Sequence, residues 1–339
     1  MTRRVELLVL ALVAALVIGL VAMASGFAAA AARGWLSAFV LVSMVPIGSL
    51  ALLLVHGISG GRWGRDLAAV LIPAARCIPL LFVAFLPVLI FRSSIYRWQE
   101  LELPLDVTRY YLNSAFFDAR TFVALAVWSA LAWCGVWRSQ LLAGLGLVAH
   151  LVLMTFILAD WVLTLPPGST SAGFGLGFGI EQIGAALALT AVLAPQGRDA
   201  RADCDLAGLL LSTLLGTMYF VYMQFIVIWY GNIPHKVHWY AARTEAGWTL
   251  VALAAFLIGA ALPFLAILNP VVRREPTALR IVGFFVLSGI ALHITWLTIP
   301  VLGAAALASA ALAALAMALP ITAAARIPPI AKVADADGR

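Results

Sequence analysis

The sequence predicts an all-α protein that spans a lipid bilayer about ten times. Of its 339 residues, 64% are hydrophobic and only 11% are charged, whereas about a quarter of the residues of a soluble domain are charged. The apolar runs are about 20 residues long or longer, which is the length a helix needs to cross the hydrocarbon core, and they lack the alternation of a strand. In lipid the backbone must satisfy its own hydrogen bonds, so such runs form helices.

Ten apolar segments follow one another along the chain. The first comes after Arg3 and Arg4 and resembles a signal peptide, but it is too long and runs into Arg33 without a polar cleavage region, so we expect it to be retained. Only Pro300 and Gly303 separate the last two segments. The predicted spans lie at about 5–28, 35–56, 67–91, 119–137, 141–164, 172–194, 206–229, 247–268, 279–299 and 301–325.

The distribution of Lys and Arg predicts how the chain is oriented. Alternate connections place thirteen of these residues on one side and seven on the other. Cytoplasmic loops carry the excess of positive charge, so we expect both termini in the cytoplasm. The long loops 92–118 and 230–246 then lie outside, and both are rich in Tyr and Trp. Such residues anchor a protein at the membrane interface, or they form a docking surface for an extracytoplasmic partner; composition favours anchoring.

Five ionisable residues stand out within the predicted spans, where each costs a few kcal/mol unless it has a partner or a function. Arg76 lies between Pro73 and Pro79, which loosen the local backbone, and we expect it to pair with Glu181 in the sixth span. A structural ion pair and a transport role are both consistent with these two residues. The five residues are Arg76, His150, Asp160, Glu181 and His293.

Three of these residues, together with Gln224, suggest a polar path. His150, Asp160 and His293 lie between mid-membrane and the outer face in the predicted topology. Histidine titrates near neutral pH and therefore suits proton transfer. The alternative for each is a hydrogen-bonded packing group. The different depths of His150 and His293 disfavour a bis-histidine haem.

Other motifs indicate packing rather than chemistry. Cys77, Cys134 and Cys204 form no CxxC pair, so we expect neither a disulfide framework nor a metal site. Gly173, Gly175, Gly177 and Gly179 have GxxxG spacing, which favours close helix packing. The sequence contains no HExxH, GxSxG or Walker motif.

Several segments, in order and spacing, resemble the NrfD-like (polysulfide-reductase-like) family, in particular the smaller NrfD-like membrane subunit of alternative complex III. The resemblance covers about residues 35–300, and the segment 224–234 is the most specific. The segments are Leu54-Val55-His56-Gly57-Ile58-Ser59-Gly60-Gly61-Arg62-Trp63-Gly64, Phe85-Leu86-Pro87-Val88-Leu89 followed by Tyr96 and Trp98, Tyr111-Leu112-Asn113 with Phe116-Phe117 and Arg120, Ala159-Asp160-Trp161-Val162, and Gln224-Phe225-Ile226-Val227-Ile228-Trp229-Tyr230-Gly231-Asn232-Ile233-Pro234 with Trp239 and Arg243.

The resemblance implies a fold of two four-helix bundles with one flanking helix at each end. The first bundle covers residues 35–165 and the second 166–300; they are preceded by a helix within 1–34 and followed by a helix at 301–325 and a cytoplasmic tail at 326–339. The resemblance also implies that the chain is a non-haem subunit of a quinol:electron-acceptor oxidoreductase in a bacterial inner membrane. Its partners would be other membrane subunits and an extracytoplasmic iron–sulfur subunit.

The resemblance further implies that the ligand is quinone or quinol, and we expect no covalently bound cofactor. The proton path would use Arg76, His150, Asp160, Glu181 and His293, with Asp160 the strongest candidate. Quinone binding or partner docking would use Gln224, Tyr230, Asn232, Trp239 and Arg243. Two alternatives stay open: a structural or assembly subunit without quinone, and a secondary transporter with helices broken at prolines.

Overall fold

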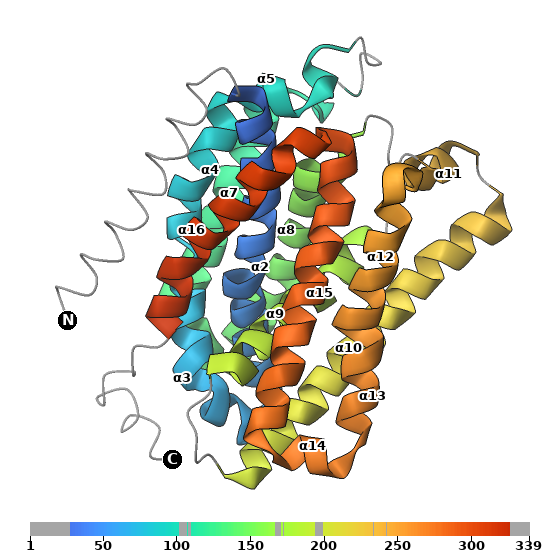
Figure 1. Ribbon diagram of the computed structural model, residues 1–339. Helices are drawn as coiled ribbons and strands as arrows, with labels where there is room; N and C mark the ends of the chain where they lie inside the picture. Colours follow the sequence, from blue (N-terminus) through green and yellow to red (C-terminus); the bar gives the residue numbers. More distant parts are fainter. Residues whose placement is uncertain are drawn as a thin grey trace.

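The computed structural model describes residues 28–325 except 102–106, 108–109, 167–170, 172, 194–198, 233 and 242. All of its regular elements are helices within this part of the chain (Figure 1). They are α2 (Ala28–Ser59), α3 (Trp63–Ala75), α4 (Leu80–Ile90), α5 (Arg92–Ile95), η1 (Arg97–Gln99), α7 (Ser114–Cys134), η2 (Val136–Arg138), α8 (Gln140–Leu158), η3 (Ala159–Leu163), α9 (Phe174–Leu193), α10 (Ala200–Gly231), α11 (Pro234–Ala241), η4 (Glu245–Gly247), α12 (Trp248–Phe256), η5 (Leu257–Ala261), α13 (Leu262–Leu268), α14 (Pro270–Arg274), α15 (Pro276–Leu302), η6 (Ala304–Ala306) and α16 (Leu307–Ala325).

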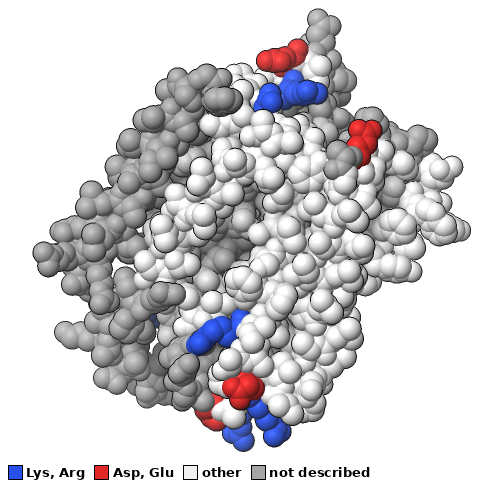
Figure 2. Space-filling model, in the orientation of Figure 1, with Lys and Arg blue, Asp and Glu red and all other residues white. Residues whose placement is uncertain are grey.

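The predicted fold class is confirmed. In the described residues, eight helices are long and apolar enough to span a membrane, and α3 with α4 forms a ninth, bent span. These match nine of the ten predicted spans; the first, at about 5–28, lies outside the described residues except for its last position. Charged side chains gather at the two ends of the visible face and leave a broad uncharged band between them (Figure 2).

The helices run between two ends, which we name after α11 and α14 (Figure 1). α2 packs against α3, α8, α9, α15 and α16, and α15 packs against α9 and α12. We call residues 28–163 the first half and residues 174–302 the second half. Both halves begin at the α11 end, where Arg33 near the start of α2 donates to the carbonyl oxygens of Ser94 and Leu302.

Proline and glycine set the breaks between helices. The third span bends by 41° between α3 and α4, beside Pro73 and Pro79, as the prolines predict. By contrast, α15 continues through Pro300 and ends only at Gly303, whose φ of 98° is a left-handed conformation that glycine tolerates. The boundary between the last two spans is therefore set by Gly303.

The fourth span begins at Ser114, five residues before its predicted start. The side chain of Asn113 accepts a hydrogen bond from the backbone N–H of Phe116 and caps the helix. The helix ends before Gly135, which has a φ of 63°. Asp118 and Arg120, in the second turn, concealed the start of the helix, because hydropathy alone does not register a cap.

Three glycines near the start of α9 permit close helix approaches. A Cβ on Gly175 would lie 3.0 Å from the Thr155 Cα of α8, and one on Gly179 would lie 2.4 Å from the Met154 Cε. On another face of α9, a Cβ on Gly177 would lie 3.3 Å from the Phe220 Cβ of α10. Gly173, the residue before α9, has nothing within 4 Å of a built Cβ. α9 is therefore held closely between α8 and α10, as the GxxxG spacing predicts.

Candidate functional site

The second half contains a cavity of about 580 Å³ near the α11 end. Residues from α9, α10, α12 and α15 form its walls, and two residues of α11 cover it. Most of its lining is aromatic or aliphatic, and its polar groups include Glu181, Gln224 and His293. A cavity of this size, apolar with a few convergent polar groups, has the character of a small-molecule site.

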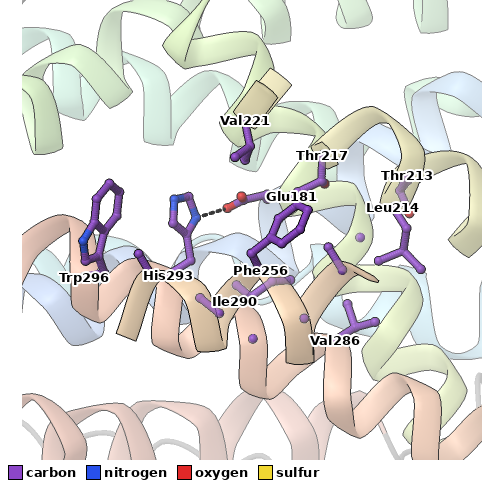
Figure 3. A pocket seen from close by; sticks show the side chains of 16 residues that line it. Glu181, Thr213, Leu214, Thr217, Val221, Phe256, Val286, Ile290, His293 and Trp296 are labelled. Atoms are coloured by element: carbon purple, nitrogen blue, oxygen red, sulfur yellow. Dashed lines mark hydrogen bonds and ion pairs between the residues drawn. The ribbon is translucent and has the colours of Figure 1, made fainter. Parts of the chain in front are cut away.

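A carboxylate–imidazole pair, with Glu181 buried and His293 partly buried, lines this cavity. The Nδ1 atom of His293 on α15 lies 2.9 Å from the Oε2 atom of Glu181 on α9 (Figure 3). The indole ring of Trp296 stacks on the His293 imidazole, with ring centroids 5.9 Å apart. Both residues of the pair also line a smaller chamber of about 130 Å³, which includes Thr213 and Thr217 of α10. The pair therefore borders both spaces.

The backbone around the pair is adapted to close contact. η5 is a single π-helical turn between α12 and α13, and such turns are frequent at functional sites. Its Gly259 touches Gly289 of α15 so closely that a Cβ on Gly289 would lie 2.0 Å from the Gly259 Cα. Both glycines line the smaller chamber, so they bring α12 and α15 together beside the pair.

Arg243 holds the α11 cover in place. Its side chain is fully buried and donates hydrogen bonds to the Leu297 carbonyl of α15 (3.1 and 3.0 Å) and the Trp239 carbonyl (2.8 Å). Its guanidinium carbon lies 3.7 Å from the centroid of the Trp239 ring, a cation–π contact. Burial lowers the pKa of Arg243 to about 10, which leaves the guanidinium charged at neutral pH.

The cover also presents polar groups of its own. Trp239 and Tyr240 both line the cavity. The Trp239 Nε1–H is buried and has no hydrogen-bond partner within the described part of the chain. Burial raises the pKa of the Tyr240 hydroxyl, which therefore stays protonated at neutral pH. Both residues of the cover thus carry an N–H or O–H donor.

The cavity is open toward the lipid-facing surface between α10 and α12. Tyr222 and Phe225 of α10 and Leu253 of α12 line it, yet each is more than half exposed. Residues that line the cavity and are also exposed at the protein surface mark an opening of the cavity. Because this surface belongs to two membrane spans, a lipophilic molecule can reach the cavity from the bilayer.

The first half holds a different buried ion pair. Arg120 of α7 binds Asp160 of η3 with two hydrogen bonds, Nε to Oδ2 at 2.6 Å and Nη2 to Oδ1 at 3.0 Å. The guanidinium carbon lies 4.2 Å from the centroid of the Tyr111 ring, and the Tyr111 hydroxyl also bonds to Asp160. Asp160 is completely buried. It is therefore fixed by two partners rather than facing either of the chambers described above.

The structure brings some of the predicted residues together and not others. Glu181, His293, Gln224 and Trp239 share one cavity, with Arg243 supporting its cover. The expected pairing of Arg76 with Glu181 is wrong, because Glu181 faces α15 and bonds to His293. Arg76 follows the end of α3, where it is exposed and its guanidinium lies 5.9 Å from the Trp133 ring.

The remaining predicted residues lie elsewhere. His150 is buried in α8 beside Trp128, with ring centroids 5.9 Å apart. Tyr230 is highly exposed at the end of α10. Asn232 ends that helix with a φ of 41°, a left-handed conformation that Asn tolerates. Neither Tyr230 nor Asn232 lines the cavity.

Sequence patterns did not show the roles of two important residues. Arg120 belonged to one of the family-like segments but was counted with the outer side at the very start of the predicted span, whereas α7 begins at Ser114 and places Arg120 well inside the helix. Trp296 was not selected because a tryptophan in an apolar run is ordinary. For Arg120 a signal existed: the Asn113 cap indicates the true helix start. For Trp296, no sequence signal shows that it stacks on His293.

The fold and these sites define a multi-pass integral membrane protein with a lipid-accessible cavity that contains a carboxylate–imidazole pair. The described residues include no cluster of three or more His, Cys, Asp or Glu that could hold a metal ion. No protein-family model and no curated protein matches the chain.

Proposed function

We propose that this chain is a membrane subunit of a quinol:electron-acceptor oxidoreductase, similar to the smaller NrfD-like subunit of alternative complex III, and that its cavity binds the quinol headgroup. The observation that carries the proposal is the Glu181–His293 pair in the lining of an aromatic cavity open to lipid. Quinols are lipophilic with a polar, two-oxygen ring, so they need this combination of an apolar path and buried hydrogen-bonding groups.

The cavity offers hydrogen-bonding groups at two depths. In our proposal, one quinol hydroxyl bonds to the Glu181–His293 pair, and the other oxygen lies toward the Trp239 N–H under the cover. Gln224, whose Nε2 lies near Gly177 on the cavity wall, offers a further amide. Tyr222 and Phe225 flank the entry, where the tail would pass into the bilayer.

The chemistry of the pair suits the oxidation. Oxidation of a quinol to a quinone releases two electrons and two protons. In our proposal the two electrons pass to an iron–sulfur partner subunit at the α11 end, the Glu181–His293 pair accepts one proton from the hydroxyl it binds, and the proton of the other hydroxyl leaves to water at the α11 end. Imidazole is suited to this step because it gains and loses a proton near neutral pH. The smaller chamber that the pair also borders would receive the proton from the pair.

The distribution of Lys and Arg supports one orientation in the membrane. The α11 end would face outward in a bacterial inner membrane, with both termini in the cytoplasm. Tyr230 and Asn232, exposed at that end, would contact the extracytoplasmic subunit, and other membrane subunits would cover part of the lipid-facing surface.

Quinone binding tests the proposal directly. Purified protein in detergent is titrated with a decyl-tailed benzoquinone and with a naphthoquinone carrying the same tail, and quenching of tryptophan fluorescence is recorded. We expect micromolar binding that Glu181→Gln and His293→Gln weaken at least tenfold. Trp239→Phe and Trp296→Phe should each remove a large part of the quenching, because both indoles line the cavity.

Glu245→Gln is the matched control, since Glu245 is exposed at the same end outside the cavity. Absence of binding to folded wild-type protein would contradict the proposal and favour a structural subunit. If quinone bound the wild type and the Glu181→Gln variant equally well, the Glu181–His293 pair would not be part of the binding site. Substrate flux through liposomes containing this chain alone would instead favour a transporter.

A further inference from the structure

A second cavity, of about 600 Å³, lies in the wall of the molecule away from the acid–base pair. α2 and α9 form its floor, and α15 and α16 form its sides. α16 turns away from α15 after Gly303, so the two helices diverge toward the α14 end (Figure 1). The space-filling view shows this face hollowed between them (Figure 2). We call this cavity the α15–α16 groove.

The groove is long and chemically uniform. On α16 its lining extends from Leu307 to Thr322, about 22 Å at the rise of an α-helix. One leaflet of a bilayer is about 15 Å deep in hydrocarbon, so the groove is long enough for a complete acyl chain. Four alanines of α16 make it narrow and smooth: Ala310, Ala311, Ala314 and Ala318.

The hydroxyl groups of the lining already have partners. Ser288 donates to Phe284, Thr295 to Ala291 and Thr322 to Ala318 through backbone carbonyls of the same helix. Ser37 is hydrogen-bonded to Thr298. The groove therefore presents methyl and methylene groups and no unused donor from these residues, which fits hydrocarbon and not a quinone headgroup.

A positive charge lies at one end of the groove. Arg280 precedes Phe284 by one helical turn on α15 and shares a face with Phe284, Leu287 and Ala291, all of which line the groove. Arg65 of α3 is exposed at the same end, and α3 packs along α16. Figure 2 shows Lys or Arg side chains between the hollow and the α14 end.

We propose that the α15–α16 groove binds one acyl chain of an anionic glycerophospholipid whose phosphate lies beside Arg280. The apolar lining holds the chain, and the arginine selects the headgroup. Arginine has five N–H donors in a planar fork that matches phosphate, so it can serve a protein neighbour and a phosphate together. This site is separate from the cavity of the acid–base pair and does not depend on its function.

Native mass spectrometry of delipidated protein tests the proposal, with phosphatidylglycerol and phosphatidylethanolamine of identical chains as probes. We expect one phosphatidylglycerol to bind, and Ala314→Phe, which fills the groove, to weaken it at least tenfold. Ala318→Leu is a milder second variant if the first does not fold. Ala308→Phe is the control, because Ala308 is exposed on the same helix outside the groove.

The headgroup is tested with Arg280→Gln, which should reduce the preference for phosphatidylglycerol about fivefold, as expected for one basic residue near an anionic lipid. Arg274→Gln, an exposed arginine of α14, should leave the preference unchanged. Equal affinity for both lipids in the wild type would overturn the role of Arg280.

Two further results would overturn the acyl-chain site. One is lipid affinity that is unchanged in folded Ala314→Phe and Ala318→Leu proteins. The other is efficient disulfide formation between Ala314→Cys and Leu8→Cys, Leu12→Cys or Leu16→Cys, because the groove would then be occupied by the chain's own first apolar segment.

Discussion

Each half of the protein buries one acid–base pair between helices, but the two pairs have different surroundings and different bases. In the first half, Asp160 is paired with Arg120, and neither residue lines the cavities described above. In the second half, Glu181 is paired with His293, and the pair borders two chambers. Arginine does not release its proton in a protein, whereas histidine does so near neutral pH. The first pair is therefore suited to structure and the second to proton exchange.

The two halves also use arginine and aromatic residues in parallel ways. Arg120 stacks on Tyr111, and Arg243 stacks on Trp239. Each arginine then bonds to the last helix of its half: Arg120 to Asp160 and Arg243 to the Leu297 carbonyl. In both cases an arginine fixes the α11-end connection to the helices, through Tyr111 in the first half and Trp239 in the second, but only in the second half does the connection cover a cavity.

The sharpest test of this contrast removes one partner from each pair. Asp160→Ala leaves the largely buried Arg120 without its carboxylate and should cost about 3–5 kcal/mol of stability. Glu181→Gln should cost only about 1 kcal/mol, because the glutamine amide can still form a hydrogen bond with the His293 imidazole. Unfolding by SDS in mixed micelles measures both, and Arg120→Met combined with Asp160→Leu should recover much of the loss. Equal losses of stability in Asp160→Ala and Glu181→Gln would contradict the proposed difference between the two pairs.

The next largest effect concerns the cover of the cavity. Arg243→Ala removes three hydrogen bonds and the stacking on Trp239, so it should destabilise the protein by about 2–3 kcal/mol. It should also make α11 accessible to protease, which limited proteolysis would detect. Arg243→Lys keeps the charge but loses the fork, and should restore only part of the protection. Undiminished protection in Arg243→Ala would show that α11 is held by other contacts.

The smallest expected effect is a pH dependence in the first half. Burial and the charge of Asp160 raise the pKa of Tyr111 to about 12, above its ordinary value of about 10. A raised folded-state pKa stabilises the protein below pH 10, and this contribution is lost as pH rises from 10 toward 12. Wild type should therefore exceed Tyr111→Phe in stability by about 1 kcal/mol at pH 8 and by less at pH 11. If the stability difference between wild type and Tyr111→Phe did not change with pH, the Tyr111 hydroxyl would not interact with Asp160 as described.

The contrast between Glu181 and Asp160 also shows how far sequence reasoning reached. Hydropathy and span length identified both residues as buried ionisable groups, because the sequence alone shows an ionisable residue within a long apolar segment. It does not show which residue is its partner. Glu181 was assigned to Arg76 on similar predicted depth, yet depth does not show which way a side chain points around its helix. Asp160 was preferred as the functional residue, while the cavity lies at Glu181.

The sequence by itself determined the class of this protein: long apolar runs with few charges must form membrane-spanning helices, since lipid offers the backbone no other partner. It also determined the kinked third span through its prolines and the close packing of α9 through most of its glycines. Tertiary structure alone decided that Glu181 meets His293, that Arg120 meets Asp160, and where the cavities lie. Those outcomes depend on the rotation of each helix about its axis and on contacts up to 112 residues apart in the chain, which local patterns do not encode.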